Sequence, residues 1–149
     1  MLPETVARLA ELPEVVAIKE ASGNLGQMAE ILRLAGDKIT LLSGDDNVTL
    51  PVLSIGGKGV ISVIANVVPK KSADMIQAWE KGDFGTAKEL FYNLFPLSQA
   101  MFIETNPIPV KTSLSLMGMI GEEMRLPLVP MAPSNLEKLK TVLKGYGLI

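Results

Sequence analysis

Three short apolar runs, each followed by a polar or glycine-rich turn and a helical pattern, constrain the fold of this chain more than any other feature. The runs are rich in β-branched residues and cover Val15–Ile18, Ile39–Leu42 and Val60–Ile64. Such runs are typical of strands that are buried on both faces of a sheet. The segments between them are long enough for the helical crossovers that parallel strands need. The pattern therefore predicts a parallel α/β structure.

Helical periodicity fills the intervals between these runs. Ser22 or Asn24 is expected to cap the helix that Gly36 ends. The predicted helices of this part of the chain cover Pro3–Glu11, Leu25–Ala35, Val48–Ile55 and about Pro69–Lys81.

After Gly82 the pattern changes to helices alone, which predicts a domain boundary between residues 82 and 83. Pro96 is expected to break or kink the first of these helices. The Asn106–Pro109 segment cannot be helical throughout, and the next helix is expected to end at Gly118 or Gly121. Ser134 has capping-box spacing to Glu137 and is expected to open a last helix.

The amino-acid composition limits the kinds of catalytic and binding site that this chain can form. The 149 residues include no cysteine and no histidine, so catalysis would rest on lysine, tyrosine, hydroxyl, carboxylate or backbone groups. The net charge of −2, without clustered lysine and arginine, argues against nucleic-acid and anionic-membrane surfaces. No signal peptide or membrane span is expected, and a cytoplasmic protein is the default. The 48% hydrophobic content suggests a buried interface.

Lys19 ends the first apolar run. Period-two alternation places it with Val15 and Ala17 on one face of the strand, opposite Val16, Ile18 and Glu20. Functional groups of parallel α/β folds gather at the carboxyl ends of strands, and burial there would favour a neutral, nucleophilic amine. Position alone still favours the simpler interpretation, a lysine that reaches past the strand end to water.

The next strand end, Ser43-Gly44-Asp45-Asp46, offers two adjacent carboxylates without an evident third ligand, so turn and cap roles are favoured over a metal site. Gly44 would let the backbone approach a ligand closely. The glycines of Gly56–Gly59 lack the full phosphate-loop and dinucleotide patterns, and a tight turn into the third strand explains them.

Four segments, VVAIKEASGNL, LLSGDD, GGKGVISVIANVVP and NPIPVK, together resemble the C-terminal half of enzymes in the dihydrodipicolinate synthase and N-acetylneuraminate lyase family of class I aldolases. The resemblance implies the last three βα units of a TIM (β/α)₈ barrel within residues 1–82 and an all-helical domain over residues 83–149. It also implies that Lys19 forms an imine with pyruvate, and that the backbone at Gly44 and Ile61 lies against the adduct. No metal or organic cofactor is implied.

The same resemblance implies condensation of pyruvate with L-aspartate semialdehyde in lysine and diaminopimelate biosynthesis. N-acetylneuraminate lyase or 2-keto-3-deoxy sugar acid aldolase activity is the alternative within the family, and an inactive structural chain is the alternative outside it. Eight βα units need about 200 residues or more, whereas three strands precede the helical part. We therefore expect a fragment that associates with a missing N-terminal half or forms a homo-oligomer, because barrel strands would otherwise expose edges and inner faces.

Overall fold

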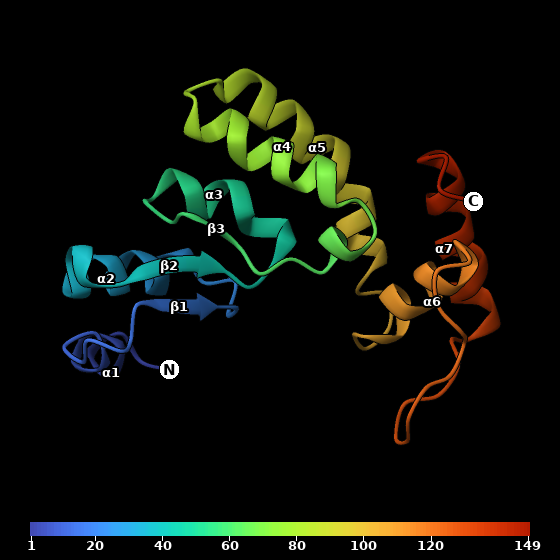
Figure 1. The fold of residues 1–149 in the computed structure, drawn as a ribbon, viewed down its shortest axis with the longest axis horizontal. Coiled ribbons are helices and arrows are strands. Elements are labelled where there is room, and N and C mark those ends of the chain that lie inside the picture. Colours follow the sequence, from blue (N-terminus) through green and yellow to red (C-terminus); the bar gives the residue numbers. More distant parts are fainter. The chain divides into compact units, whose positions relative to one another are not determined.

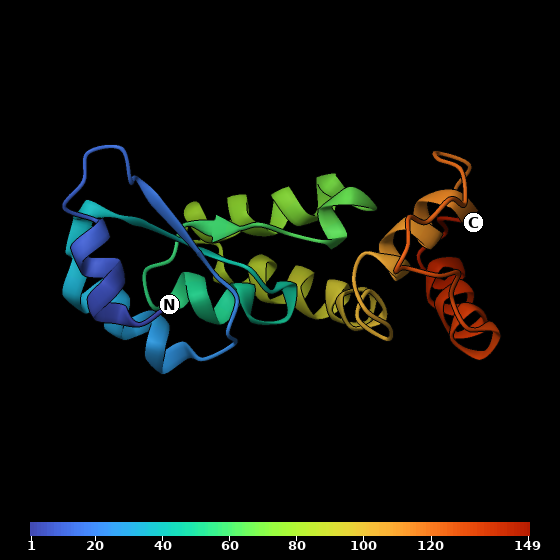
Figure 2. The ribbon, with the colours of Figure 1, turned by 90° about the horizontal axis from the view of Figure 1, so that it is seen from below.

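In the computed structural model, which describes residues 1–149, the chain divides into two compact units, residues 1–62 and residues 63–149. The first unit contains all the strands and the second contains helices. The elements are shown in Figures 1 and 2.

The first unit contains a three-stranded parallel sheet with the order β1-β2-β3, which confirms the predicted parallel α/β pattern. The strands are β1 (Ala17–Glu20), β2 (Thr40–Ser43) and β3 (Gly59–Val60). Lys19 pairs with Leu42, and Leu42 pairs with Gly59, so these residues lie at one level across the sheet.

Three helices cover one face of this sheet: α1 (Pro3–Leu9), α2 (Leu25–Ala35) and α3 (Thr49–Ser54). Their apolar side chains bury Leu41 completely and cover much of Ile18. The other face carries the exposed Ala17 and Thr40, because no element of this unit packs over it. The fully buried apolar residues of this core are Val6, Met28, Ile31, Leu41 and Val52.

All three predicted strands have different bounds in the structure. The first strand begins at Ala17 instead of Val15 and extends through Lys19 to Glu20. The second is shifted by one residue, from the predicted Ile39–Leu42 to Thr40–Ser43. The third is only two residues long, Gly59–Val60, and Ile64, the last residue of the predicted strand, begins a 3₁₀ turn that ends at Asn66. The Ile61 N–H, directly after β3, donates to the carbonyl of Ser43, the last residue of β2.

The second unit packs four helices around its own core: α4 (Pro69–Glu80), α5 (Phe84–Ala100), α6 (Ile108–Leu116) and α7 (Pro133–Gly145). Helices α4 and α5 lie side by side along their length (Figure 1). Helix α4 therefore packs with the second unit. The boundary after Gly82, between the barrel part and the helical domain, stays a prediction. The fully buried apolar residues of this core include Leu97, Met101, Leu139 and Leu143.

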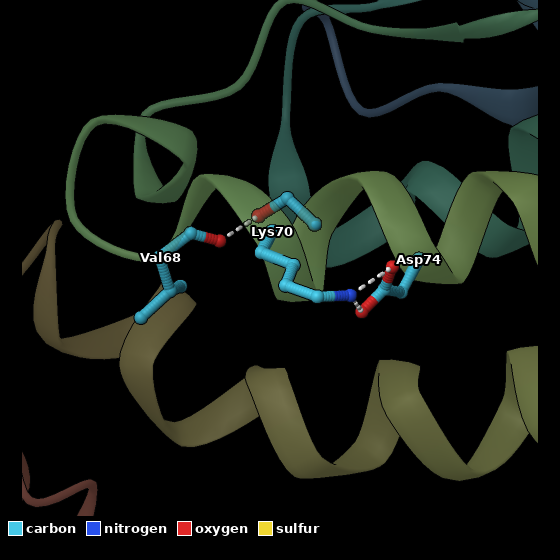
Figure 3. A network of polar contacts seen from close by, with 4 residues as sticks. Val68, Lys70 and Asp74 are labelled. Atoms are coloured by element: carbon cyan, nitrogen blue, oxygen red, sulfur yellow. Dashed lines mark hydrogen bonds and ion pairs between the residues drawn. The ribbon is translucent and has the colours of Figure 1, made fainter.

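The first turns of α4 show how the helix begins and how its surface is charged. The Ser72 hydroxyl donates to the Val68 carbonyl at 3.1 Å, and Lys70 forms an ion pair with Asp74 at 2.8 Å (Figure 3). The two charged residues are one helical turn apart, the spacing at which opposite charges support a helix. No helix in the chain has the length and apolarity that crossing a membrane requires.

Two local predictions in the helical part are corrected. Pro96 does not break α5, which continues to Ala100, while a kink at this proline stays a prediction. The buried Leu94 and Leu97 on either side of the proline hold the helix against the core. Ser134 does not cap α7, which begins at Pro133 and has no side-chain cap.

A residue from another segment supports the start of α7 instead. The Glu104 carboxylate accepts hydrogen bonds from the Ala132 N–H and the Asn135 side chain, both at 2.9 Å. A tertiary contact has therefore replaced the local capping box that the sequence pattern suggests.

Candidate active site

The three residues singled out in the sequence lie at the carboxyl ends of neighbouring strands. Lys19 is the penultimate residue of β1, Gly44 follows β2, and Ile61 follows β3. The Gly44 N–H donates to the Glu20 carbonyl and the Ile61 N–H to the Ser43 carbonyl, both at 2.8 Å. Backbone hydrogen bonds thus hold the three strand ends together within the first unit.

By strand register, Lys19 and Ile61 lie on the sheet face that no helix of the first unit covers. By strand alternation, Lys19 shares this face with its partner Leu42, whereas Ile18 and Leu41 point to the helical core. Lys19 is exposed, and Ile61 retains 47% of its accessible surface. The sequence analysis considered burial of Lys19 at the strand end. In this chain by itself, Lys19 is not buried.

Gly44 lies directly against the Lys19 side chain. A Cβ atom at position 44 would fall 2.8 Å from Lys19 Cε and 2.5 Å from Ala21 Cβ. The lysine stem could rotate away, but the Ala21 Cβ is fixed to the backbone of the turn after β1. The absence of a side chain at Gly44 is therefore a steric requirement for placing Lys19 and the turn side by side.

Glu20 is a feature of this site that the sequence reasoning missed. It is 5% exposed, and its carboxylate accepts hydrogen bonds from the Ser22 N–H at 2.6 Å and from Gln27 Nε2 at 3.0 Å. Burial raises the pKa of Glu20, but the hydrogen bonds from Ser22 and Gln27 outweigh it and hold the pKa below the ordinary value. The sequence did contain a signal for this. Strand alternation places Glu20 on the same covered face as Ile18, and a carboxylate buried there must find hydrogen-bond donors.

The turn that follows Glu20 is ordered by short-range hydrogen bonds. Asn24 caps α2 by accepting the Gln27 N–H at 3.1 Å, which identifies it as the cap among the two predicted candidates. The Ser22 hydroxyl accepts the Asn24 N–H at 3.2 Å. Glu20, Ser22 and Asn24 therefore form a continuous set of contacts from β1 to α2.

Asp45 acts as a turn residue. Its carboxylate accepts hydrogen bonds from the Asn47 N–H at 2.9 Å and from the Asn47 side chain at 3.0 Å. The structure contains no group of three acidic side chains that could hold a metal ion. This geometry agrees with the cap and turn role favoured from the sequence.

The second unit contains a separate cavity and both tyrosines. The cavity, of about 240 Å³, lies beside α6 and α7, and none of the three predicted site residues lines it. The Tyr146 hydroxyl donates to the Asn93 carbonyl, and burial raises its pKa. Tyr92 is 66% exposed. Neither tyrosine belongs to the unit that carries Lys19.

Comparison with known proteins gives a consistent result. Residues 1–146 match the Dihydrodipicolinate synthetase family. The 4-hydroxy-tetrahydrodipicolinate synthase of Thermodesulfovibrio yellowstonii is 60% identical over 149 residues, which are 100% of this chain and 51% of that protein. The corresponding enzyme of Geobacter sulfurreducens is 56% identical with the same coverage. The chain thus spans about half the length of the curated relatives it matches.

Solved structures of dihydrodipicolinate synthases share the fold of this chain. Dihydrodipicolinate synthase from Aquifex aeolicus superimposes with a TM-score of 0.96 at 46% identity, covering 99% of this chain and 50% of that one. The chloride-inhibited Acinetobacter baumannii enzyme, complexed with pyruvate, gives a TM-score of 0.94 at 36% identity, covering 99% and 51%. With this fold and the family match over nearly its full length, the chain belongs to the dihydrodipicolinate synthetase family.

Proposed function

We propose that this chain supplies the imine-forming half of a pyruvate-dependent class I lyase. The reaction is the condensation of pyruvate with L-aspartate semialdehyde in lysine and diaminopimelate biosynthesis. The observation that carries the proposal is the position of Lys19, which is exposed at the end of β1 on the open sheet face, directly against Gly44. A family member of known structure was crystallised with pyruvate, which supports the choice of the first substrate.

The chemistry begins at Lys19. Its neutral Nζ attacks the carbonyl carbon of pyruvate, and loss of water leaves a protonated imine. The positive nitrogen then takes up the electron pair left when the methyl group loses a proton, giving an enamine. The enamine carbon attacks the aldehyde carbon of the second substrate, whose oxygen takes up a proton, and the imine re-forms at the Lys19 nitrogen. The amino group of the former L-aspartate semialdehyde then attacks the imine carbon. The bond from this carbon to Nζ breaks, and its electron pair and a proton go to Nζ, which restores the free amine. The imine itself is the electron sink, so the proposal includes no metal or organic cofactor.

Gly44 and Ile61 are proposed to line the adduct through their backbone. Their N–H groups are engaged with Glu20 and Ser43, which leaves the carbonyl groups and the small Gly44 Cα to face the substrate. Such positions at strand ends are where barrels of this class gather their functional groups.

Completion of the site requires more than this chain. The groups that bind the pyruvate carboxylate, relay protons and receive the second substrate are proposed to lie in the part of the family fold that this chain does not span. We therefore expect little or no turnover from the isolated chain. Its partner would be the missing half of the barrel or further copies in a homo-oligomer, and either would cover the face that carries Lys19.

A chimaera tests this proposal. This chain would replace the matching half of the Thermodesulfovibrio yellowstonii enzyme, to which it is 60% identical. We expect the chimaera to consume pyruvate with L-aspartate semialdehyde and the Lys19→Arg chimaera to be inactive. Cleavage of N-acetylneuraminate or a 2-keto-3-deoxy sugar acid, without the condensation, would assign the chain to another activity of the family. A folded chimaera with no activity in any assay would support a structural role.

A further inference from the structure

We propose that Glu20 is a positioning residue for Lys19: the hydrogen bonds that its side chain accepts hold the strand end that carries the amine. The inference rests on the proposed function, because it assigns Lys19 as the imine-forming residue. Glu20 follows Lys19 in β1 and points to the covered face, so it does not share the open face with the amine. Its effect must therefore act through the backbone.

Glu20 connects three segments of the first unit. Its Oε1 accepts the Ser22 N–H of the following turn at 2.6 Å, and its Oε2 accepts Gln27 Nε2 of α2 at 3.0 Å. Its backbone carbonyl accepts the Gly44 N–H after β2 at 2.8 Å. A shift of Lys19 along or away from the sheet would strain all three contacts.

The closeness of Gly44 makes this position sensitive. The Lys19 stem and Ala21 lie where a side chain at position 44 would be, so there is no spare room between the two strand ends. Loss of the Glu20 side-chain contacts would free the turn that carries Ala21 and let it move relative to Gly44. An amine displaced by about 1 Å can lose up to about 100-fold in rate.

Two substitutions separate hydrogen bonding from charge. Glu20→Gln removes the charge but keeps an acceptor for the Ser22 N–H, and its amide can bond Gln27 once the Gln27 amide turns over. Glu20→Met has a similar length but provides no strong acceptor for either donor. Glu30→Met is the matched control, because Glu30 lies partly exposed on α2 and its carboxylate accepts hydrogen bonds from Arg33 of the same helix.

Two measurements are made on the full 149-residue chain and its variants. One is the rate at which borohydride traps pyruvate on Lys19, measured at several pyruvate concentrations and corrected for the folded fraction. The other is hydrogen exchange of the Gly44 amide, which needs no substrate. We expect Glu20→Met to lower the maximal trapping rate by about 10- to 100-fold, with little change in the half-saturating pyruvate concentration. We expect the same variant to speed Gly44 exchange, and Glu20→Gln and Glu30→Met to stay within about threefold of the parent chain in both.

The outcomes separate the two proposals. Equal losses in Glu20→Gln and Glu20→Met would overturn positioning in favour of a direct effect of the charge. Normal trapping or unchanged Gly44 exchange in folded Glu20→Met would also overturn it. If the parent chain is folded and traps no pyruvate, the proposed function fails, and Gly44 exchange alone then decides whether Glu20 holds the strand end.

Discussion

The two units of the chain use their apolar residues differently. In the helical unit, Leu97, Met101, Leu139 and Leu143 are all completely buried within the unit itself. In the strand-containing unit, Leu41 is completely buried beneath the helices, whereas Ile61 on the opposite face is 47% exposed. A bundle can close its core with four helices, but a three-stranded section of sheet needs a second layer or further strands. The comparison teaches that the open face, which also carries Lys19, is the part of the first unit that its own side chains leave uncovered.

The largest expected effect on stability comes from comparing a substitution in the closed core of the helical unit with one on the open sheet face. Leu97→Ala should lower the free energy of unfolding of the helical unit by about 2–5 kcal/mol, because a cavity replaces a completely buried side chain. Ile61→Ala should change the stability of the first unit by only about 0.5 kcal/mol in the isolated chain. Fluorescence of Trp79, the only tryptophan, reports unfolding of the helical unit, and amide exchange reports the first. Equal costs at the two positions would show that the face of Ile61 is already covered in solution.

Gly44→Ala should have the next largest effect. The new Cβ would fall 2.5 Å from Ala21 Cβ, so the strand ends must separate, at a cost of about 1–3 kcal/mol. Pyruvate trapping at Lys19 should fall by about tenfold or more. The matched control is Gly85→Ala in the helical unit, where the new Cβ would be 3.7 Å from Asp83 Oδ1 and the change should be neutral or stabilising. Denaturant unfolding and trapping rates check both variants, and a neutral Gly44→Ala would contradict the steric account.

Acidification should weaken the first unit through Glu20. The pKa of Glu20 in the folded chain lies below its ordinary value of 4.5, so its contribution to stability is complete above pH 4.5. This contribution is lost as the pH falls through the lower folded pKa. Amide exchange in the first unit, followed from about pH 6 to about pH 3, should show this loss. In Glu20→Gln the pH dependence should be smaller, and an unchanged profile would mean that other carboxylates dominate.

The smallest expected effect concerns the surface of the helical unit. Asp74→Asn removes the exposed ion pair with Lys70 on α4 (Figure 3). It should cost about 0.3–0.5 kcal/mol at low salt and less at high salt. Thermal unfolding followed by Trp79 at two salt concentrations measures the difference. A cost above that of a core substitution would mean that surface charge, rather than packing, stabilises this unit.

Local rules predicted the helices better than the strands. The helix Leu25–Ala35 has the predicted bounds, since its cap at Asn24 and its end at Gly36 depend on neighbouring residues. The third strand was predicted to be longer because apolar residues continue past Val60. Its actual length depends on the hydrogen-bond partners that β2 offers, and these are set by the fold.

The sequence placed Lys19 and Gly44 at strand ends, and the structure brings them into contact. Sequence spacing could not show that Glu20 connects the turn, α2 and β2, because Gln27 and Gly44 meet it only after folding. It also could not show that Lys19 stays exposed in this chain, since burial depends on whatever covers the open face. These features depend on tertiary contacts rather than on local pattern.

The most direct test of the central claim is a mass measurement on Lys19. The 149-residue chain is incubated with pyruvate, reduced with borohydride and digested, and its lysine peptides are weighed, with Lys58 as an internal control on the same unit. The account predicts that the peptide with Lys19 gains the mass of a reduced pyruvate imine and that the peptide with Lys58 does not. An unmodified Lys19 in a folded chain, or equal modification of both lysines, would contradict it.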